Sequence, residues 1–280
     1  MIASQLINIG STKLKKMKIH SHLLDSELIL SSVLNTSREK MLITSEKKVS
    51  KNNIVDFKKL LERRSKREPM AYIFKEKEFW SKSFLVDKNA LIPRPETELL
   101  VEKISKYFKN REVFILDIGT GSGCILLSLL DEIKKSSGIG IDISRKAINI
   151  AIKNSKKLKT KNKFKFLNRS LNEIFGYKFD VVVSNPPYIC THQIKNLSDD
   201  IKKYEPRIAL DGGKDGLDVI KKVIYKSKTI LKRKGMLALE IGNRQYKEVS
   251  KILKLHGFKN KFLIKDCQNN IRCIITLLEQ

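Results

Sequence analysis

The tetrapeptide Asn185-Pro186-Pro187-Tyr188 is the stretch of this sequence whose residue types point most directly to chemistry. It follows the run 179–184, which predicts a buried strand. Open α/β sheets bind ligands at the carboxyl ends of such strands. The two prolines stop the strand, make the turn rigid and fix the direction of the backbone carbonyls. The tetrapeptide therefore predicts a rigid corner that faces a ligand.

This corner has the groups needed to hold a planar NH2 group. The Asn185 side-chain oxygen and the Pro186 carbonyl can both accept N–H hydrogen bonds, and Tyr188 can pack against the flat group and exclude water. An amide or exocyclic amino nitrogen is a poor nucleophile, because its lone pair is delocalised. An enzyme can align this nitrogen and stabilise the positive charge that develops on it. We therefore predict group transfer to such a nitrogen, with Asn185, Pro186 and Tyr188 as the catalytic residues.

A glycine-rich stretch, Asp117-Ile118-Gly119-Thr120-Gly121-Ser122-Gly123, lies between a predicted strand at 113–118 and a predicted helix at 124–133. Its GxGxG spacing is one residue shorter than the GxGxxG dinucleotide fingerprint, in which a helix start meets a pyrophosphate. S-Adenosylmethionine has no phosphate, but it has an ammonium group on which Asp117 can act directly or by ordering the loop. The stretch favours this cofactor, and a dinucleotide or an ordinary turn are the alternatives.

A second acid, Asp142, ends the next predicted strand at 138–143, where a carboxylate can accept hydrogen bonds from ribose hydroxyls. We expect the cofactor-binding residues in this region to be Asp117, Gly119, Thr120, Gly121, Ser122, Gly123 and Asp142. The methyl donor is already activated, so the expected chemistry needs no metal. The four cysteines and four histidines also lack the spacing of metal ligands.

The chain around these motifs divides into a helical first part and an alternating second part. Apolar residues at helical spacing predict helices at 2–18, 21–34 and 51–67, and aromatic and β-branched residues at 72–74 and 79–86 predict a hairpin. After residue 112, alternation predicts a parallel sheet with helices on both faces. The other expected elements are strands at 163–167, 236–241, 262–265 and 273–278 and helices at 145–158, 216–233 and 245–256. The last two strands should form an antiparallel hairpin at the sheet edge.

Composition limits the remaining possibilities. The 280 residues are 41% hydrophobic, enough for a sizeable core in one large or two modest domains. No apolar run approaches the ~20 residues that cross a membrane, and residues 1–10 are too polar for a secretory signal, so we expect a cytoplasmic protein. The net charge of +27 suits RNA or a ribosome. The lysines are nevertheless scattered through every segment, so compositional drift stays open beside selected affinity for nucleic acid.

These motifs together resemble the release factor glutamine methyltransferases, the HemK/PrmC family, over nearly the whole chain. The most distinctive segment is Leu91-Ile92-Pro93-Arg94-Pro95-Glu96-Thr97-Glu98. Resemblance extends to residues 25–30, 37–39, 68–73, 78–80, 185–188, 205–210 and 239–242. Two places depart from the family pattern: Lys75 stands where members usually have glycine, and Asn168-Arg169-Ser170-Leu171 replaces an acid that is often followed by an aromatic residue.

The resemblance implies an α/β fold: a Rossmann-like S-adenosylmethionine-dependent methyltransferase domain, with a mostly parallel seven-stranded sheet and an antiparallel edge hairpin, preceded by a small helical N-terminal domain. The implied divisions are a substrate-docking domain at 1–70, a β-hairpin linker at 71–95 and a catalytic domain at 96–280. The implied reaction is methylation of the side-chain nitrogen (N5) of the glutamine in the Gly-Gly-Gln motif of peptide chain release factors. Asn185, Pro186, Pro187 and Tyr188 would bind this glutamine, and Leu171 and Asn185 would also contact the cofactor.

The alternative is a DNA or RNA adenine or cytosine amino-methyltransferase, which shares the tetrapeptide and the mechanism. The net charge of +27 suits this alternative. Against it, the sequence has no recognisable target-recognition domain, and a flipped base would need a pocket and a track for the phosphates. A weak affinity for nucleic acid or the ribosome is expected as an accessory property, and no membrane partner is expected.

Overall fold

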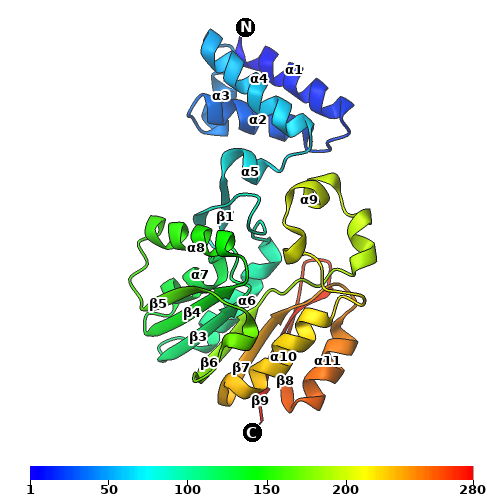
Figure 1. Ribbon diagram of the computed structural model, residues 1–280. Helices are drawn as coiled ribbons and strands as arrows, with labels where there is room; N and C mark the ends of the chain where they lie inside the picture. Colours follow the sequence, from blue (N-terminus) through cyan, green and yellow to red (C-terminus); the bar gives the residue numbers. More distant parts are fainter. Residues whose placement is uncertain (280) are drawn as a thin grey trace. The chain divides into compact units, whose positions relative to one another are not determined.

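Residues 1–279 are described by a computed structural model, and the chain forms two units (Figure 1). The first unit contains Met1–Lys75 and, later in the chain, Ser198–Tyr204. The second unit contains Glu76–Leu197 and the chain from Glu205 onward, and so holds both sequence motifs. The predicted division at 1–70, 71–95 and 96–280 stays a prediction; it did not include the return of residues 198–204 to the first unit.

The first unit is helical, with its apolar residues packed in one core. Its helices are α1 (Ala3–Lys16), α2 (His22–Val33), α3 (Arg38–Ile43), α4 (Lys51–Ser65), α5 (Met70–Phe74) and α9 (Asp199–Tyr204). Leu14, Leu30 and Phe57 are fully buried in that core, as helical spacing of apolar residues requires. The predicted helices at 2–18, 21–34 and 51–67 are confirmed as α1, α2 and α4, whereas the short α3 was not predicted.

Helix α9 is held in the first unit by a buried arginine. Arg64 on α4 donates from Nε to Asp25 at 2.7 Å and from Nη1 to Asp200 on α9 at 2.9 Å. Tyr204 adds a hydrogen bond from its hydroxyl to the Lys66 carbonyl at 2.8 Å. A buried guanidinium needs acidic partners, and α9 supplies one of them, which explains why this distant segment belongs with the N-terminal helices.

The predicted hairpin is correct in its second half and wrong in its first. Tyr72–Phe74 lie in helix α5, not in a strand, and the hairpin is formed by β1 (Glu76–Phe79) and β2 (Lys82–Leu85). The cause is Pro69, whose φ of −58° suits a helix start and whose carbonyl accepts from the Tyr72 and Ile73 amides. Helix α5 ends at Lys75, whose φ of 60° is the left-handed conformation that favours glycine, the usual family residue there.

The second unit is built on a seven-stranded sheet, as predicted. Its strands are β3 (Val113–Ile118), β4 (Ser136–Asp142), β5 (Phe164–Asn168), β6 (Phe179–Ser184), β7 (Leu231–Glu240), β8 (Phe258–Lys265) and β9 (Ile271–Leu278). The spatial order is β5-β4-β3-β6-β7-β9-β8. The first five strands are parallel, and β9 runs antiparallel to β7 and β8, which confirms the edge hairpin. The order reverses at β3, and ligands bind at such switch points.

Helices cover both faces of this sheet (Figure 1). Successive residues of one strand serve opposite faces: Ile115 packs in the cluster of α6 (Glu98–Tyr107) and α7 (Cys124–Glu132), and Leu116 packs in the cluster of α10 (Asp218–Ile230) and α11 (Tyr246–Leu255). Helix α8 (Arg145–Lys157) contacts β4 and β5. Burial on both faces explains the nearly continuous apolar runs of β3 and β6. Within residues 1–279, no helix is both long and apolar enough to span a bilayer.

Candidate active site

The glycine-rich loop and the tetrapeptide lie at the same edge of the sheet, because each follows one of two neighbouring parallel strands. Ile118 at the end of β3 is the register partner of Ser184 at the end of β6. The Ser184 hydroxyl donates to the Ile118 carbonyl at 2.8 Å and so ties the two strand ends together. Residues that are 66 positions apart in sequence are thereby adjacent at the switch point of the sheet.

The glycine-rich loop is held by two acids that accept hydrogen bonds from it, the buried Asp117 and the half-buried Asp142. Asp142 accepts from the Gly121 amide at 3.0 Å and from the Ser144 amide at 2.8 Å. Asp117 accepts from the Thr120 hydroxyl at 2.7 Å. Gly119, Gly121 and Gly123 have φ values of 71°, 55° and 81°, a region that side chains with a Cβ rarely adopt. The loop therefore needs glycine at the three positions that the sequence motif marks.

Asp117 is completely buried beneath this loop, and one of its oxygens, Oδ1, has no hydrogen-bond partner among the described residues. Burial raises the pKa of Asp117 to about 7, against the opposing effect of the Thr120 hydrogen bond. Burial likewise raises the pKa of Asp142, and its backbone hydrogen bonds oppose this rise. Of the two actions predicted for Asp117, direct contact or ordering of the loop, the Thr120 hydrogen bond supports the second.

A cavity of about 660 Å³ opens beside the loop and the tetrapeptide. Six of the predicted site residues line it: Gly119, Gly121, Asp142, Leu171, Asn185 and Pro187. The walls also carry apolar side chains from α10, Val219 and Val223, and the volume is in the range of small-molecule and cofactor sites. Ser170 lines it together with Leu171, at the place where the sequence departs from the family pattern. The cavity therefore suits an elongated cofactor, with a flat ring against the apolar walls and a polar end near the glycine-rich loop.

The other predicted residues lie outside the set that lines the cavity. Asp117, Thr120, Ser122 and Gly123 are buried in the loop and its supports. Pro186 is buried in the corner, and Tyr188 is half-buried. The structure thus brings all the predicted residues to one edge of the sheet, with different degrees of access to the cavity.

Four residues that the sequence analysis left without a role in catalysis surround the tetrapeptide. The Asn185 Nδ2 donates to the Thr97 hydroxyl at 3.1 Å, and that hydroxyl donates to Glu240 at 2.6 Å. The Tyr188 hydroxyl donates to Glu240 at 3.2 Å and accepts from Arg272 at 3.1 Å. Gln245 donates to the Tyr188 carbonyl at 3.0 Å. Glu240 ends β7. An acid at the carboxyl end of a predicted strand was the signal that indicated Asp142, and the same signal could have indicated Glu240.

Burial controls the ionisation of this group. Glu240 has no exposed surface, and burial raises its pKa, while the Thr97 hydrogen bond and the charge of Arg272 oppose the rise. Burial also raises the pKa of Tyr188 to about 12, so its hydroxyl stays protonated at neutral pH and can donate.

The backbone of the corner is crowded by Gly212 in the loop before α10. A Cβ on Gly212 would lie 2.8 Å from the Pro187 carbonyl oxygen and 2.8 Å from Tyr188 Cα. Gly212 also donates from its amide to the Ile189 carbonyl at 2.8 Å. The turn that contains Gly212 therefore packs directly on the tetrapeptide.

Residues 205–207 lie between the cavity and the proline-rich segment before α6. Glu205 is buried and accepts from Arg94 at 2.6 Å and from the Ile92 amide at 3.2 Å. Pro206 and Arg207 line the cavity. Glu205 therefore joins this segment to the proline-rich segment before α6. By contrast, His192 is exposed in a 3-10 turn at Thr191–Asn196 and is not among the residues that line the cavity.

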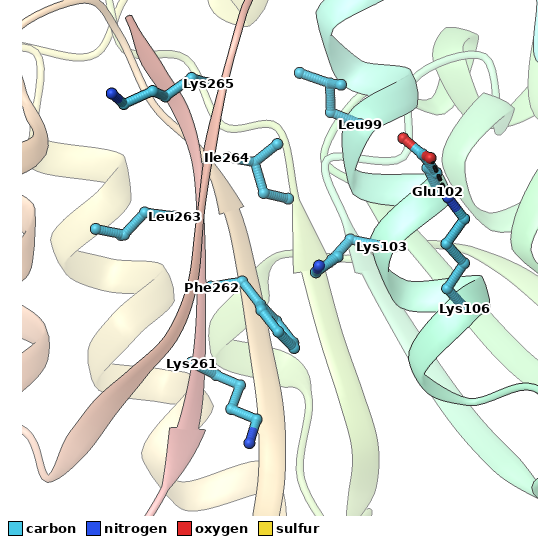
Figure 2. Close-up of a pocket in the computed structure, with 9 residues that line it drawn as sticks. All are labelled: Leu99, Glu102, Lys103, Lys106, Lys261, Phe262, Leu263, Ile264 and Lys265. Carbon is cyan, nitrogen blue, oxygen red and sulfur yellow. Dashed lines mark hydrogen bonds and ion pairs between the residues drawn. The ribbon is translucent and has the colours of Figure 1, made fainter. Parts of the chain in front are cut away.

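A second hollow, of about 490 Å³, lies between α6 and β8 (Figure 2). Its lining includes four lysines around apolar side chains: Lys103, Lys106, Lys261 and Lys265. Lys103 Nζ is 4.0 Å from the centre of the Phe262 ring, within cation–π range. We call this hollow the lysine groove. Its lining contains none of the predicted site residues.

Two family models match the chain: the PrmC N-terminal domain at residues 5–74 and the methyltransferase small domain at residues 95–203. The release factor glutamine methyltransferase of Clostridium acetobutylicum is 38% identical, with 94% of this chain and 94% of that protein covered. A bifunctional methyltransferase of Rickettsia felis is 36% identical over 97% of this chain, which spans 57% of the length of that relative.

Among solved structures, a methyltransferase from Pyrococcus furiosus has the same fold. Its TM-score is 0.56 at 15% sequence identity, with 78% of this chain and 99% of that chain covered. At this identity the likeness concerns the fold of the sheet and its helices, and the details of the site depend on the residues described above.

Proposed function

This chain belongs to the release factor glutamine methyltransferases, and on that premise we propose that it transfers the methyl group of S-adenosylmethionine to a glutamine side-chain nitrogen in a peptide chain release factor. The acceptor is the N5 nitrogen of the glutamine in the Gly-Gly-Gln motif. The observation that carries the proposal is a shared cavity: Asn185 and Pro187 line the same space as Gly119, Gly121 and Asp142.

The residues around the cavity suit the cofactor. S-Adenosylmethionine, when bound, supplies a methyl group on a positively charged sulfur that is activated for displacement. Gly119 and Gly121 leave space for a ligand to approach the backbone, since a Cβ on Gly119 would meet no protein atom within 4 Å. Asp142 can accept from ribose hydroxyls in addition to the loop amides, and Leu171 can pack on the adenine. Asp117 supports the loop from beneath through Thr120.

The tetrapeptide supplies the acceptors for the glutamine amide. Asn185 Oδ1 and the Pro186 carbonyl each accept one N–H of the substrate NH2 group, which turns the nitrogen lone pair toward the methyl group. The same two oxygens stabilise the positive charge that builds up on nitrogen during transfer. Tyr188 packs beside the planar amide and excludes water, and Pro187 lines the cavity next to Asn185.

The first unit is assigned to docking of the release factor, and the whole reaction to the cytoplasm, where release factors act. The family model of the PrmC N-terminal domain covers residues 5–74 of this unit. The unit also exposes apolar side chains, including Ile9, Leu23 and Leu24, which a protein partner can cover.

A weak affinity for RNA or the ribosome is assigned to the lysine groove. Three of its lysines, Lys106, Lys261 and Lys265, are exposed, and clustered lysines attract phosphates without regard to base sequence. In the double variant Lys103→Glu with Lys261→Glu, RNA binding at low salt should fall about tenfold. The matched control is Lys153→Glu with Lys156→Glu, which changes the charge equally on the exposed face of α8. Equal losses in the two double variants would contradict a role for the groove.

The decisive experiment offers the enzyme both classes of substrate at once. Purified release factor, bulk RNA and bulk DNA are incubated with the protein and S-adenosylmethionine labelled on its methyl group. We expect label on the release factor, as N5-methylglutamine, and no label on a release factor whose Gly-Gly-Gln glutamine is replaced by alanine. Label on nucleic acid alone would replace this function by that of a DNA or RNA amino-methyltransferase.

A further inference from the structure

Glu240 is a buried carboxylate whose partners lie at both ends of the tetrapeptide. It sits at the end of β7 with no exposed surface, and it accepts hydroxyl hydrogen bonds from Thr97 at 2.6 Å and Tyr188 at 3.2 Å. Arg272 lies 3.9 Å from it. Burial raises the pKa of Glu240, and these three neighbours oppose that rise. In this arrangement Glu240 accepts one hydrogen bond on each of its two oxygens, and the hydrogen of each hydroxyl is directed toward it.

These contacts of Glu240 set the direction of the hydrogen bond between Thr97 and Asn185. The Thr97 hydroxyl has a single hydrogen, and that hydrogen is directed to Glu240. Toward Asn185, the Thr97 oxygen can therefore act only as an acceptor, and the Asn185 NH2 group must face it, at 3.1 Å. The other end of the same amide, Oδ1, then faces away from Thr97, and Asn185 is one of the residues that line the cavity.

The orientation matters because an asparagine amide has a donor end and an acceptor end of nearly the same shape. With Oδ1 toward the substrate, Asn185 accepts an N–H from the glutamine amide. With the amide flipped, two NH2 groups would face each other and no hydrogen bond could form. The hydroxyl of Thr97 is free for this task, because Thr97 is the residue before α6 but makes no capping hydrogen bond with its side chain.

We propose that Thr97 and Glu240 are positioning residues that hold the Asn185 amide with its oxygen toward the substrate, an inference that rests on the proposed glutamine methyltransfer. Glu240 also fixes the orientation of Tyr188. The Tyr188 hydroxyl gives its hydrogen to Glu240 and accepts from Arg272 at 3.1 Å, which anchors the ring beside the corner. One carboxylate thus orients the first and the last residue of the tetrapeptide.

The test compares three threonine variants with the wild-type protein. Thr97→Val keeps the shape of the side chain and removes the hydroxyl, and Thr97→Ser keeps the hydroxyl. Thr276→Val is the matched control, because Thr276 is also fully buried and donates to a backbone carbonyl, that of Leu237, at 3.3 Å. For each protein, kcat and KM with release factor, the Kd for S-adenosylmethionine and the melting temperature are measured.

We expect Thr97→Val to lower kcat about 10- to 100-fold, the usual size of an effect that acts through a neighbouring residue. The Kd for the cofactor should change less than about twofold, Thr97→Ser should recover most of the turnover, and Thr276→Val should keep the wild-type kcat. The positioning role would be overturned by a wild-type kcat in Thr97→Val, by failure of serine to restore turnover, or by an equal loss in Thr276→Val.

A second variant covers the case in which Thr97→Val does not fold. Glu240→Gln keeps the volume but has one acceptor oxygen for two hydroxyl donors, so one hydrogen bond must reverse or break, and kcat should fall at least about tenfold. Wild-type turnover in Glu240→Gln would contradict the inference. Transfer by the wild-type enzyme in the same assay separates this failure from that of the proposed function, because a wild-type enzyme that leaves the release factor unmethylated overturns both.

Discussion

The glycine-rich loop and the tetrapeptide corner lie next to each other at the ends of β3 and β6, but they are stabilised in different ways. The loop is shaped mainly by its own residues, three glycines at positive φ and a hydrogen bond from Thr120 to Asp117 three residues earlier, with one further hydrogen bond from the Gly121 amide to Asp142, 21 positions away. The corner depends on distant residues, since Thr97 is 88 positions from Asn185 and Glu240 is 52 positions from Tyr188.

This difference matches the tasks of the two segments. A loop that lets a ligand approach the backbone needs mainly the absence of side chains and a defined turn, which local residues can supply. A corner that aligns a reacting nitrogen must orient individual oxygen atoms, and such precision requires supporting hydrogen bonds from outside the segment. Substitutions in the loop should therefore affect cofactor affinity, and substitutions around the corner should affect turnover.

The largest expected effect is on the corner itself. Asn185→Ala removes an oxygen that stabilises charge in the transition state, so kcat should fall about 100- to 1000-fold while the cofactor Kd changes little. Turnover is measured with labelled S-adenosylmethionine, and affinity by calorimetry. His192→Ala, in the exposed turn that follows, is the control and should keep the wild-type kcat. Retained turnover in Asn185→Ala would contradict the assignment of the corner to turnover and of the loop to cofactor affinity.

The next effect concerns the packing of the corner. Gly212→Ala places a Cβ 2.8 Å from the backbone of Pro187 and Tyr188, so the corner must shift. We expect kcat to fall about tenfold or more, and the free energy of unfolding to fall by ~1–3 kcal/mol. The control, Gly176→Ala, has a φ of 76° but no atom within 4 Å of the new Cβ, so it should lose about 1 kcal/mol and keep its turnover. Similar kcat values for the two variants would show that the corner tolerates displacement.

A smaller and different effect is expected in the loop. Gly119→Ala adds a methyl group that meets no protein atom within 4 Å, at a φ of 71°, beside the cavity. The protein should fold, the Kd for S-adenosylmethionine should rise about tenfold through lost space, and kcat at saturating cofactor should change less than about threefold. Equilibrium binding and steady-state kinetics separate these quantities. A large fall in kcat at unchanged Kd would contradict the assignment of the loop to the cofactor.

The last effect concerns stability without ligand and does not involve turnover. Burial raises the pKa of Asp117 to about 7, above its value of about 4 in an unfolded chain. The folded state therefore binds this proton more tightly, and the carboxyl stabilises the fold below about pH 4 and loses this contribution as the pH rises to about 7. Asp117→Asn removes the dependence, so its unfolding free energy relative to wild type should increase between pH 4 and pH 8 by a few kcal/mol, as measured by denaturant unfolding. Parallel pH profiles would show that Asp117 is ionised in the folded protein.

Most of the sheet could be predicted from sequence, because its strands are short apolar runs between turn signals. β3 and β6 have the predicted bounds, and the antiparallel edge followed from the missing helix between β8 and β9. The failure at Tyr72–Phe74 has a local cause. Aromatic and β-branched residues favour strands on average, but Pro69 starts a helix and its carbonyl accepts the amides that continue it.

The return of α9 to the N-terminal unit could not be predicted in the same way. Its sequence, Asp199–Tyr204, contains charged residues typical of a solvent-exposed helix. Its position follows from Arg64, a buried cation that needs a second carboxylate besides Asp25 and obtains it from Asp200. Such a pairing joins residues 136 positions apart, and no local pattern records it.

The sequence by itself determined where the functional segments lie along the chain. A glycine-rich turn follows one buried strand, an acid follows the next, and a corner made rigid by prolines follows a later one. These features depend on backbone conformation and apolar burial, which neighbouring residues control. The tertiary structure alone decided which atoms face the cavity, because the direction of an amide or a hydroxyl depends on the partners it meets. Thr97 and Glu240 reach Asn185 and Tyr188 from other elements of the fold, and their hydrogen bonds follow from how the chain packs.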